Sequence, residues 1–214
     1  MASKQCDSME LVVRATQYAA KMHTGQFRKS NPNIPYLNHP IDVMCKLVEI
    51  GQVRDPDVLA AAVLHDTVED CKHNGACIED IEKLFGKRVA GFVAEVTDDK
   101  SLSKADRKRA QIANAPKKSP QAMMIKLADK LSNLSDMQEH PPLSWDNKRI
   151  QGYFVWAYFV LKPMAQANQA LASELRAVFS GKFCYQGRYY PCLPLTNMEA
   201  VLERYLASME ICSD

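Results

Sequence analysis

Hydrophobic residues recur at helical spacing along most of this chain. In residues 8–23, for example, Leu11, Ala15 and Tyr18 share one face, and apolar residues spaced three and four apart predict an amphipathic helix. The same spacing, with prolines and glycines at several of the ends, predicts further helices. These cover 40–51, 55–70, 78–85, 87–97, 121–137, 145–178 and 197–210, and Pro163 is expected to kink the longest of them. The pattern therefore predicts an all-α fold, a bundle of several helices.

The composition changes at Gly181, after which the chain reads FCYQGRYYPCLP before the amphipathic segment 197–210. We therefore expect a helical domain over 1–178 and a short C-terminal extension of unknown role over 179–214. The extension is either an appendage packed on the domain or an interaction helix. Its apolar periodicity favours packing.

Composition narrows the class of protein without indicating a chemistry. Of 214 residues, 47% are hydrophobic and 24% are charged, as in ordinary globular proteins. No apolar run approaches the roughly 18 residues of a membrane span, and the seven cysteines, without a CxxC pair, are typical of free thiols. We expect a cytoplasmic protein with no membrane partner; its oligomeric state is open.

The basic run 100–118 raises the alternative of a nucleic-acid-binding patch. The net charge of +2 is too small to indicate such a partner, and Asp99 and Asp106 interrupt the run. A solvated helix face is therefore the favoured interpretation, and no nucleic-acid partner is expected.

Four ionisable residues follow an apolar stretch in AAAVLHDTVED. His65 is four residues from Glu69, and Asp66 is four residues from Asp70, so a continuous helix would place all four along one stripe. Buried ionisable groups cost free energy unless they are paired or bind a metal. A divalent cation would stabilise so much convergent negative charge.

Two further ligand candidates lie elsewhere in the chain. His39 precedes Pro40, and Asp129 interrupts the apolar face of MMIKLADKLSNL. Together with His65 and Asp66 they form a mixed nitrogen and oxygen set that suits Mn²⁺, Fe²⁺ or Zn²⁺. A satisfied structural histidine near a helix end is the alternative that the spacing leaves open.

The ordered set H…HD…D resembles the signature of HD-domain metal-dependent phosphohydrolases. Longer strings resemble the hydrolase domain of RelA/SpoT enzymes, which degrade the alarmone (p)ppGpp, and above all its small stand-alone animal members. These strings are HTGQFRKS (23–30), PYLNHP (35–40), LHDTVED (64–70), VTDDK (96–100) and KLADKLSNL (126–134). The resemblance covers roughly residues 8–178 and implies an HD-domain helix bundle with a single metal site between helices.

The resemblance also implies a reaction, removal of the 3′-diphosphate of ppGpp to give GDP and pyrophosphate. Glu69 and Asp70 match the acidic pair that positions and deprotonates the attacking water. A divalent ion lowers the pKa of a bound water and polarises a phosphoryl oxygen, while a nearby carboxylate accepts the proton. The residues that would hold one Mn²⁺ ion are His39, His65, Asp66 and Asp129.

The resemblance assigns further residues to the nucleotide. Arg28 and Lys29 match a basic pair that contacts the base and phosphates, and Tyr36 would pack against the ribose. Asn133 would bind the nucleoside, although an asparagine one turn after a ligand could instead hydrogen-bond within its helix. The full substrate set is Arg28, Lys29, Tyr36, Lys100, Asn133 and Arg149. Aromatic residues at helical spacing are expected in the core; these are Trp145, Tyr153, Phe154 and Trp156.

The chain departs from the family pattern at Ser132, Ser135 and Gly152, where an aromatic residue or histidine, an arginine and an acidic residue are usual. None is expected to touch the metal set, so the departures bear on the substrate more than on the chemistry. A metal-dependent phosphatase acting on NADPH or another 2′- or 3′-phosphorylated nucleotide is one alternative, which releases orthophosphate. A non-catalytic nucleotide-sensing HD protein is another.

Overall fold

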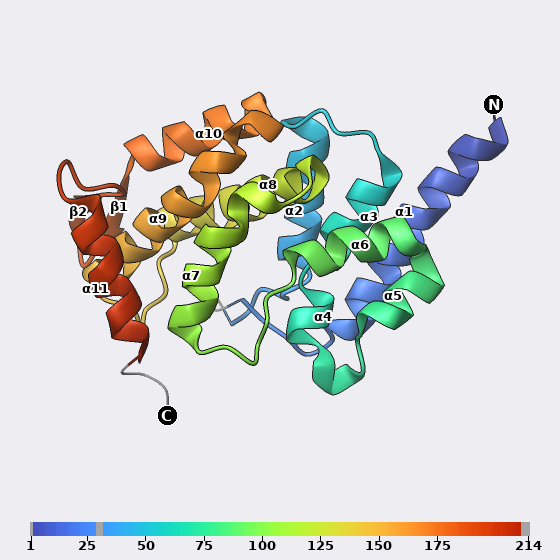
Figure 1. The fold of residues 1–214 in the computed structure, drawn as a ribbon, viewed down its shortest axis with the longest axis horizontal. Helices are drawn as coiled ribbons and strands as arrows, with labels where there is room; N and C mark the ends of the chain where they lie inside the picture. The colour runs from blue at the N-terminus through green and yellow to red at the C-terminus, as the bar shows by residue number, and fades with distance from the viewer. Residues whose placement is uncertain (1, 29–31, 211–214) are drawn as a thin grey trace.

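The fold of this chain, described by a computed structural model over residues 2–28 and 32–210, is helical almost throughout (Figure 1). This confirms the predicted all-α class. Eight of the helices belong to the first two thirds of the chain: α1 (Ala2–Met22), α2 (Asn38–Glu49), α3 (Pro56–Leu64), α4 (Thr67–Asp70), α5 (Ile78–Phe85), α6 (Lys87–Val96), α7 (Lys104–Asn114) and α8 (Pro120–Glu139). They are followed by α9 (Asn147–Leu161), α10 (Gln169–Ser180), the hairpin β1 (Lys182–Tyr185) and β2 (Arg188–Pro191), and α11 (Met198–Glu210). Short 3₁₀ turns lie at Lys72–Asn74, Ala115–Lys117 and Lys162–Ala167.

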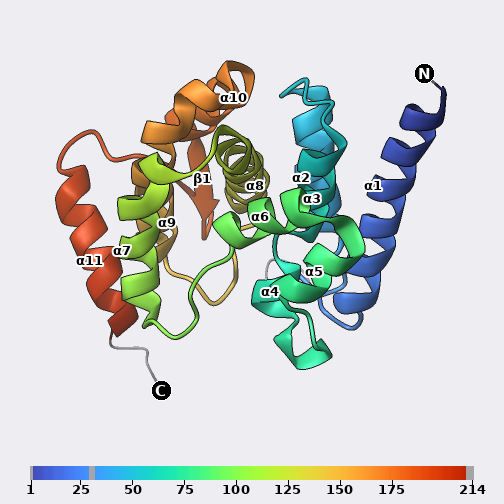
Figure 2. The ribbon, with the colours of Figure 1, turned by 45° about the vertical axis from the view of Figure 1, so that its right-hand side comes forward.

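The helix α8 runs through the middle of the molecule and is buried on most of its surface. Helices α2, α3 and α6 lie on one side of it, and α9, α10 and β1 lie on the other (Figure 2). The alanines of α3 are fully buried, and their small side chains let α1, α2 and α6 approach α3 closely. Ionisable residues on α8 can therefore meet side chains from both halves.

The predicted helix over 55–70 is wrong at its centre, because α3 ends at Leu64 and α4 begins at Thr67. Side chains at the break form hydrogen bonds to carbonyl groups of the preceding turn. His65 Nδ1 lies 2.8 Å from the Ala62 carbonyl, and Thr67 Oγ1 donates to the Leu64 carbonyl at 2.7 Å. Such local side-chain bonds compete with a continuous helical ladder.

The predicted helix over 145–178 is also wrong as one element. Pro163 lies in the 3₁₀ turn between α9 and α10, and a proline cannot supply the amide that would continue the helix. Asn168 then begins α10, because its side chain accepts from the Leu171 amide at 3.1 Å. The first helix begins earlier than the expected residue 8.

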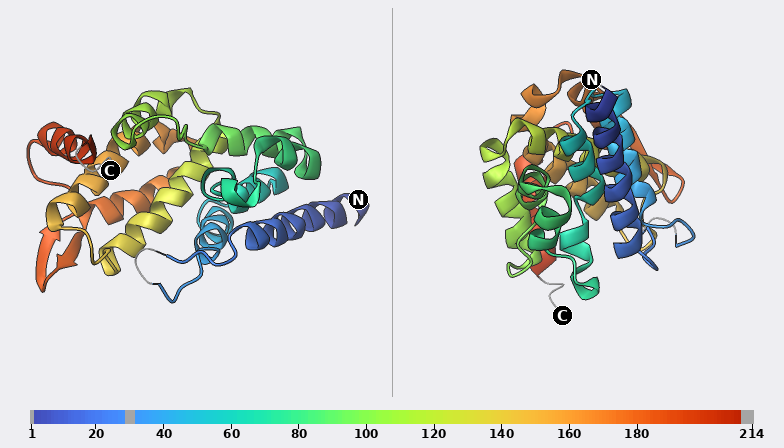
Figure 3. Two further views of the ribbon diagram at one scale, coloured as in Figure 1. Left: turned by 90° about the horizontal axis from the view of Figure 1, so that it is seen from below. Right: turned by 90° about the vertical axis from the view of Figure 1, so that its right-hand side faces the viewer.

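The extension folds back onto the helical domain. The two strands pair antiparallel across a Gln186–Gly187 turn in which both residues have positive φ, the geometry of a tight hairpin. The sequence pattern did not predict this hairpin. Helix α11 packs against α9 and α7, at the end of the molecule opposite α1 (Figure 3). Among the described residues, no helix combines the length and the hydropathy that crossing a membrane requires.

Candidate active site

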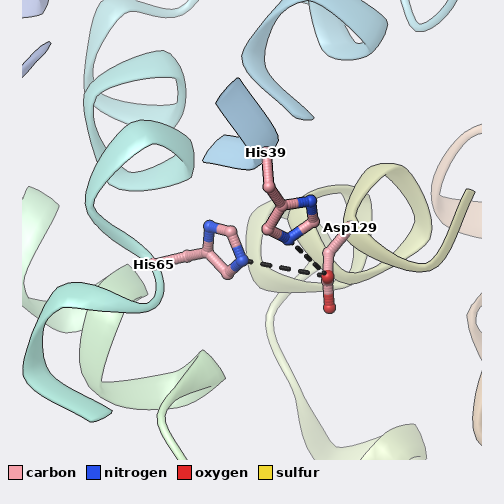
Figure 4. A group of neighbouring side chains, drawn as sticks. All are labelled: His39, His65 and Asp129. Carbon is pink, nitrogen blue, oxygen red and sulfur yellow. Dashed lines mark ion pairs between the residues drawn. The ribbon is translucent and has the colours of Figure 1, made fainter. Parts of the chain in front are cut away.

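Three predicted metal ligands from three separate elements point toward one another (Figure 4). His39 comes from α2, His65 from the junction of α3 and α4, and Asp129 from α8. One possible ligand atom from each lies within 4.8 Å of the other two, and all three residues are buried. Asp129 Oδ1 is 3.3 Å from His39 Nε2 and 3.8 Å from His65 Nε2.

The two histidines present Nε2 to the cluster because each uses Nδ1 elsewhere. The Ala62 carbonyl accepts from Nδ1 of His65 at 2.8 Å, which leaves Nε2 unprotonated in the neutral ring. His39 Nδ1 lies 3.1 Å from Ser132 Oγ. Neither Nε2 atom has a hydrogen-bond partner among the described residues, although both are buried. Buried nitrogen and carboxylate atoms that face one another in this way fit a divalent cation.

Ser132 contradicts the expectation that the departures from the family pattern avoid the metal set. Its hydroxyl contacts His39 from 93 positions away in the chain. A partner at Nδ1 fixes the orientation of a metal-binding imidazole. Ser132 is thus a positioning residue that sequence reasoning missed, since no local pattern links it to His39.

Asp66, the fourth predicted ligand, lies beside the two histidines. Its Oδ2 is 3.0 Å from His65 Nε2 and 3.6 Å from His39 Nε2. The same oxygen accepts a hydrogen bond from the Tyr36 hydroxyl at 2.6 Å. Tyr36, predicted to pack on a ribose, therefore holds Asp66 in place.

Asp129 is held by two neighbours on its own helix. Lys130 Nζ donates to its Oδ2 at 2.7 Å, and Asn133 Nδ2 donates to its Oδ1 at 2.7 Å. The alternative interpretation of Asn133, a hydrogen bond within its helix, is thus realised. Lys130 was missed, although a lysine among the apolar residues of this segment is a signal of the same kind as Asp129.

The pKa values of the two histidines shift in opposite directions. Burial opposes a proton on His65, but Asp66 and Asp129 outweigh it and raise the pKa of His65 to about 9. Burial dominates at His39 and lowers its pKa. Burial alone would raise the pKa of Asp129, yet Lys130 and His39 hold it well below its ordinary value. The carboxylates are therefore ionised and suited to a cation.

The acidic pair follows the break after Leu64, so the four ionisable residues of LHDTVED do not belong to one continuous helix, although the Asp70 amide still donates to the Asp66 carbonyl at 2.8 Å. Glu69 and Asp70 both lie beside Lys100, which belongs to the connection between α6 and α7. Lys100 Nζ is 2.8 Å from Asp70 Oδ1 and 3.6 Å from Glu69 Oε1. Burial, followed by the charges of Asp98 and Asp66, raises the pKa of Glu69. Glu69 is therefore a stronger base than an ordinary glutamate.

A cleft of about 500 Å³ lies over these groups. Tyr36 and Asn133 form part of its lining and also contact Asp66 and Asp129, so the metal cluster lies directly behind this wall. Glu69 and Asp70 line the cleft as well. The remaining charged lining includes a group of cations, which are Arg28, Lys100, Lys104, Arg107, Lys108 and Arg149. This mixture fits an anionic ligand bound beside a divalent ion.

The structure brings most of the predicted substrate residues to the cleft. Arg28 pairs with Asp136 at 2.8 Å and with Asn133 at 3.2 Å. Arg149 lies over the Trp145 ring, with 4.4 Å between its Cζ and the ring centroid. Lys29 falls outside the described residues. Tyr153, expected in the core, packs there but also lines the cleft.

The chain is similar to known proteins over most of its length. Residues 15–159 match the family described as HD domain. The guanosine-3′,5′-bis(diphosphate) 3′-pyrophosphohydrolase MESH1 of Danio rerio is 42% identical, over 81% of this chain and 95% of its own length. The protein of that name in Drosophila melanogaster is 49% identical, over 76% of this chain and 89% of its own.

A solved structure described as a metazoan orthologue of SpoT that hydrolyzes ppGpp and plays a role in starvation responses superposes with a TM-score of 0.76. It is 47% identical to this chain and covers 79% of it and 93% of its own length. The hairpin and α11 lie beyond the residues that match the family.

Proposed function

The chain belongs to the HD domain family, and from this premise we propose that it is a Mn²⁺-dependent enzyme that hydrolyses ppGpp to GDP and pyrophosphate. The observation that carries the proposal is the pair of buried, unpartnered Nε2 atoms facing Asp129 behind a cleft lined by cations. The MESH1 relatives, which are named for this activity, support the choice of substrate.

His39, His65, Asp66 and Asp129 would hold the ion, one Mn²⁺ per chain. Three of them already have ligand atoms within 4.8 Å of one another, and Asp66 contacts both imidazoles. When bound, such an ion activates water as a nucleophile and polarises a phosphoryl oxygen. Nitrogen and carboxylate ligands are compatible with Mn²⁺, and the preference over Fe²⁺ or Zn²⁺ rests on the family resemblance.

Glu69 would act as the general base and Asp70 would help to position the attacking water. The raised pKa of Glu69 strengthens it as a proton acceptor. The Asp98 amide lies 3.3 Å from Glu69 Oε2 and leaves the other oxygen, Oε1, on the side of Lys100. Lys100 would orient this pair and meet the substrate phosphates.

The cationic lining would bind the remaining phosphates and the nucleoside. Arg28 is fixed by Asp136 and Asn133, and a guanidinium held in this way can present its other N–H groups to a phosphate. Arg149 would contact a phosphate from the opposite helix α9, and the family resemblance assigns Lys29, which lies outside the described residues, to the substrate as well.

The test is to incubate metal-stripped protein with ppGpp and, separately, with NADPH, with and without Mn²⁺, and to identify the phosphorus product. We expect pyrophosphate from ppGpp only when Mn²⁺ is present. Orthophosphate from NADPH alone would contradict the proposed substrate while keeping the metal chemistry. No product from either nucleotide would contradict the proposed activity.

A matched variant separates turnover from binding. Glu69→Gln preserves size and hydrogen bonding but cannot accept a proton, so we expect kcat to fall by about 10²- to 10⁴-fold with the affinity for ppGpp retained. Loss of nucleotide binding together with turnover would count against a catalytic role for Glu69. Unchanged turnover would assign the base to another group.

A further inference from the structure

The C-terminal extension contributes directly to the wall of the cleft. Tyr205 and Met209 of α11 line it together with residues of α7 and α9. Gly152 of α9 makes this approach possible, because a Cβ atom there would lie 2.6 Å from Tyr205 Cδ2. The departure from the family pattern at Gly152 thus allows Tyr205 of α11 to pack against α9. An ion pair of 2.8 Å between Arg109 and Glu210 also ties α11 to α7.

Lys108 of α7 lies against the aromatic rings of α9 and α11. Its Nζ lies 3.3 Å from the centroid of a Trp156 ring, 5.1 Å from that of Tyr153 and 5.4 Å from that of Tyr205. Trp156 Nε1 donates to the Lys108 carbonyl at 3.1 Å, which fixes this turn of α7. Within the described part of the chain, Lys108 has no ion pair with a carboxylate shorter than 4.0 Å. Burial lowers its pKa well below the ordinary value, so an anionic ligand would stabilise the charged form.

Tyr205, another residue of the cleft lining, carries a buried hydroxyl group. The residue is 3% exposed, and its hydroxyl has no hydrogen-bond partner among the residues described. A buried hydroxyl without a partner costs free energy. The groups that act electrostatically on this hydroxyl are Tyr153 and Arg149, and both line the cleft.

We propose that Lys108 and Tyr205 form a subsite for the phosphates at the end of the nucleotide that is not cleaved, with Tyr205 as a specificity-determining residue. The inference rests on the proposed function, which places the scissile 3′-diphosphate beside the metal cluster and Glu69. Helix α7 lies between α4 and α11 in Figure 1 and in the left view of Figure 3, so a nucleotide bound at α4 would extend toward Lys108. The 5′-diphosphate of ppGpp is the anionic group that this end would receive.

The test compares ppGpp with guanosine 3′-diphosphate, which has the same scissile group but no 5′-phosphates. Tyr205→Phe keeps the ring against Gly152 and Lys108 and removes only the hydroxyl. We expect it to raise the KM for ppGpp about tenfold, the effect of one hydrogen bond to a charged group, with kcat and the KM for guanosine 3′-diphosphate unchanged. Lys108→Gln should have the same selective effect. Equal changes with both substrates, or no change with either, would overturn the proposal.

A matched control addresses the packing of α11. Leu206 is buried beside Tyr205 in the same helix but does not line the cleft. Leu206→Ala should lower the melting temperature and leave the ratio of the two KM values unaltered. A change in that ratio would show that loosening of α11, and not Tyr205 itself, sets specificity.

A binding measurement separates this subsite from the proposed activity. GDP carries the 5′-diphosphate but no scissile group, and guanosine carries neither. If Mn²⁺-loaded wild-type protein fails to hydrolyse ppGpp, the proposed function fails, yet the subsite still predicts GDP binding that Tyr205→Phe and Lys108→Gln each weaken about tenfold, with guanosine binding unaffected. GDP binding that neither variant weakens would overturn the subsite.

Discussion

At the residue scale, the metal cluster depends on which ring nitrogen each histidine uses for support. Nδ1 of His65 contacts the Ala62 carbonyl, and Nδ1 of His39 contacts the Ser132 hydroxyl. Both Nε2 atoms are then directed at Asp129 and Asp66. Each Nε2 atom is thereby left to face a carboxylate, Asp66 for His65 at 3.0 Å and Asp129 for His39 at 3.3 Å.

Mn²⁺ binding should therefore release a proton from His65. In the metal-free protein its pKa is raised to about 9, so at pH 7 the ring is protonated and must lose that proton before Nε2 can bind a metal ion. We expect about one proton released per ion, and an affinity for Mn²⁺ that falls as the pH falls. Calorimetry in buffers with different ionisation enthalpies measures this release. A binding enthalpy at pH 7 that does not depend on the buffer would contradict it.

The ligand candidates could be predicted from sequence because His65, Asp66 and Asp129 interrupt apolar patterns. Their supports could not. Ser132 and His39 meet only through the packing of α8 on α2. A sequence pattern does not show that two residues 93 positions apart are in contact. The sequence pattern predicts a solvated helix face for Lys108, but its aromatic neighbours come from α9 and α11.

At the element scale, the short break between α3 and α4 interrupts the segment that contains four of the ionisable site residues. The spacing in LHDTVED correctly identified a concentration of ionisable residues, but helical periodicity placed them on one stripe. The bonds from His65 and Thr67 to the preceding carbonyls interrupt the helix. His65 lies close to Asp66 and Asp129, and Glu69 and Asp70 both contact Lys100.

The start of α3 offers a direct test of what holds these elements in place. Asp55 accepts from the Asp57 amide at 3.0 Å and pairs with Arg88 of α6 at 2.6 Å. Asp55→Ala should lower the free energy of unfolding by about 1 kcal/mol through loss of the cap, as measured by urea denaturation. Asp55→Asn is the control, because an asparagine caps as well as an aspartate.

The penalty should also depend on pH. Burial alone would raise the pKa of Asp55, but hydrogen bonds from Arg88 and the Asp57 amide outweigh it and lower that pKa. A lowered folded-state pKa contributes stability that is present above the unfolded-state value and is lost as the pH falls through the folded-state value. The difference between Asp55→Ala and wild type should therefore shrink in acid. A difference that is constant from neutral pH to acid would contradict this account.

At the scale of the whole molecule, the cluster joins the central helix α8 to the half of the fold that contains α2 and α3. His39 and His65 belong to elements on one side of α8, and Asp129 belongs to α8 itself. A bound ion would therefore stabilise the packing of the central helix. The extension is less predictable from sequence, because the seat of Tyr205 on Gly152 joins residues that no local pattern connects.

Mn²⁺ should accordingly raise the melting temperature. At a free concentration of about 100 times Kd, a ligand that binds only the folded state contributes about 2.7 kcal/mol, which corresponds to roughly 5–10 °C for a domain of this size. Asp129→Ala should remove the shift, and differential scanning calorimetry would detect it. An equal shift in wild type and variant would place Mn²⁺ binding elsewhere.

The most direct test of the central claim is pyrophosphate release from ppGpp while Mn²⁺ is added back to metal-stripped wild-type protein and to Asp129→Ala. The account predicts no release without metal, a rate that rises until about one ion is bound per chain, and no release from Asp129→Ala at any Mn²⁺ concentration. Pyrophosphate release by the metal-free protein, or wild-type rates from Asp129→Ala, would contradict it.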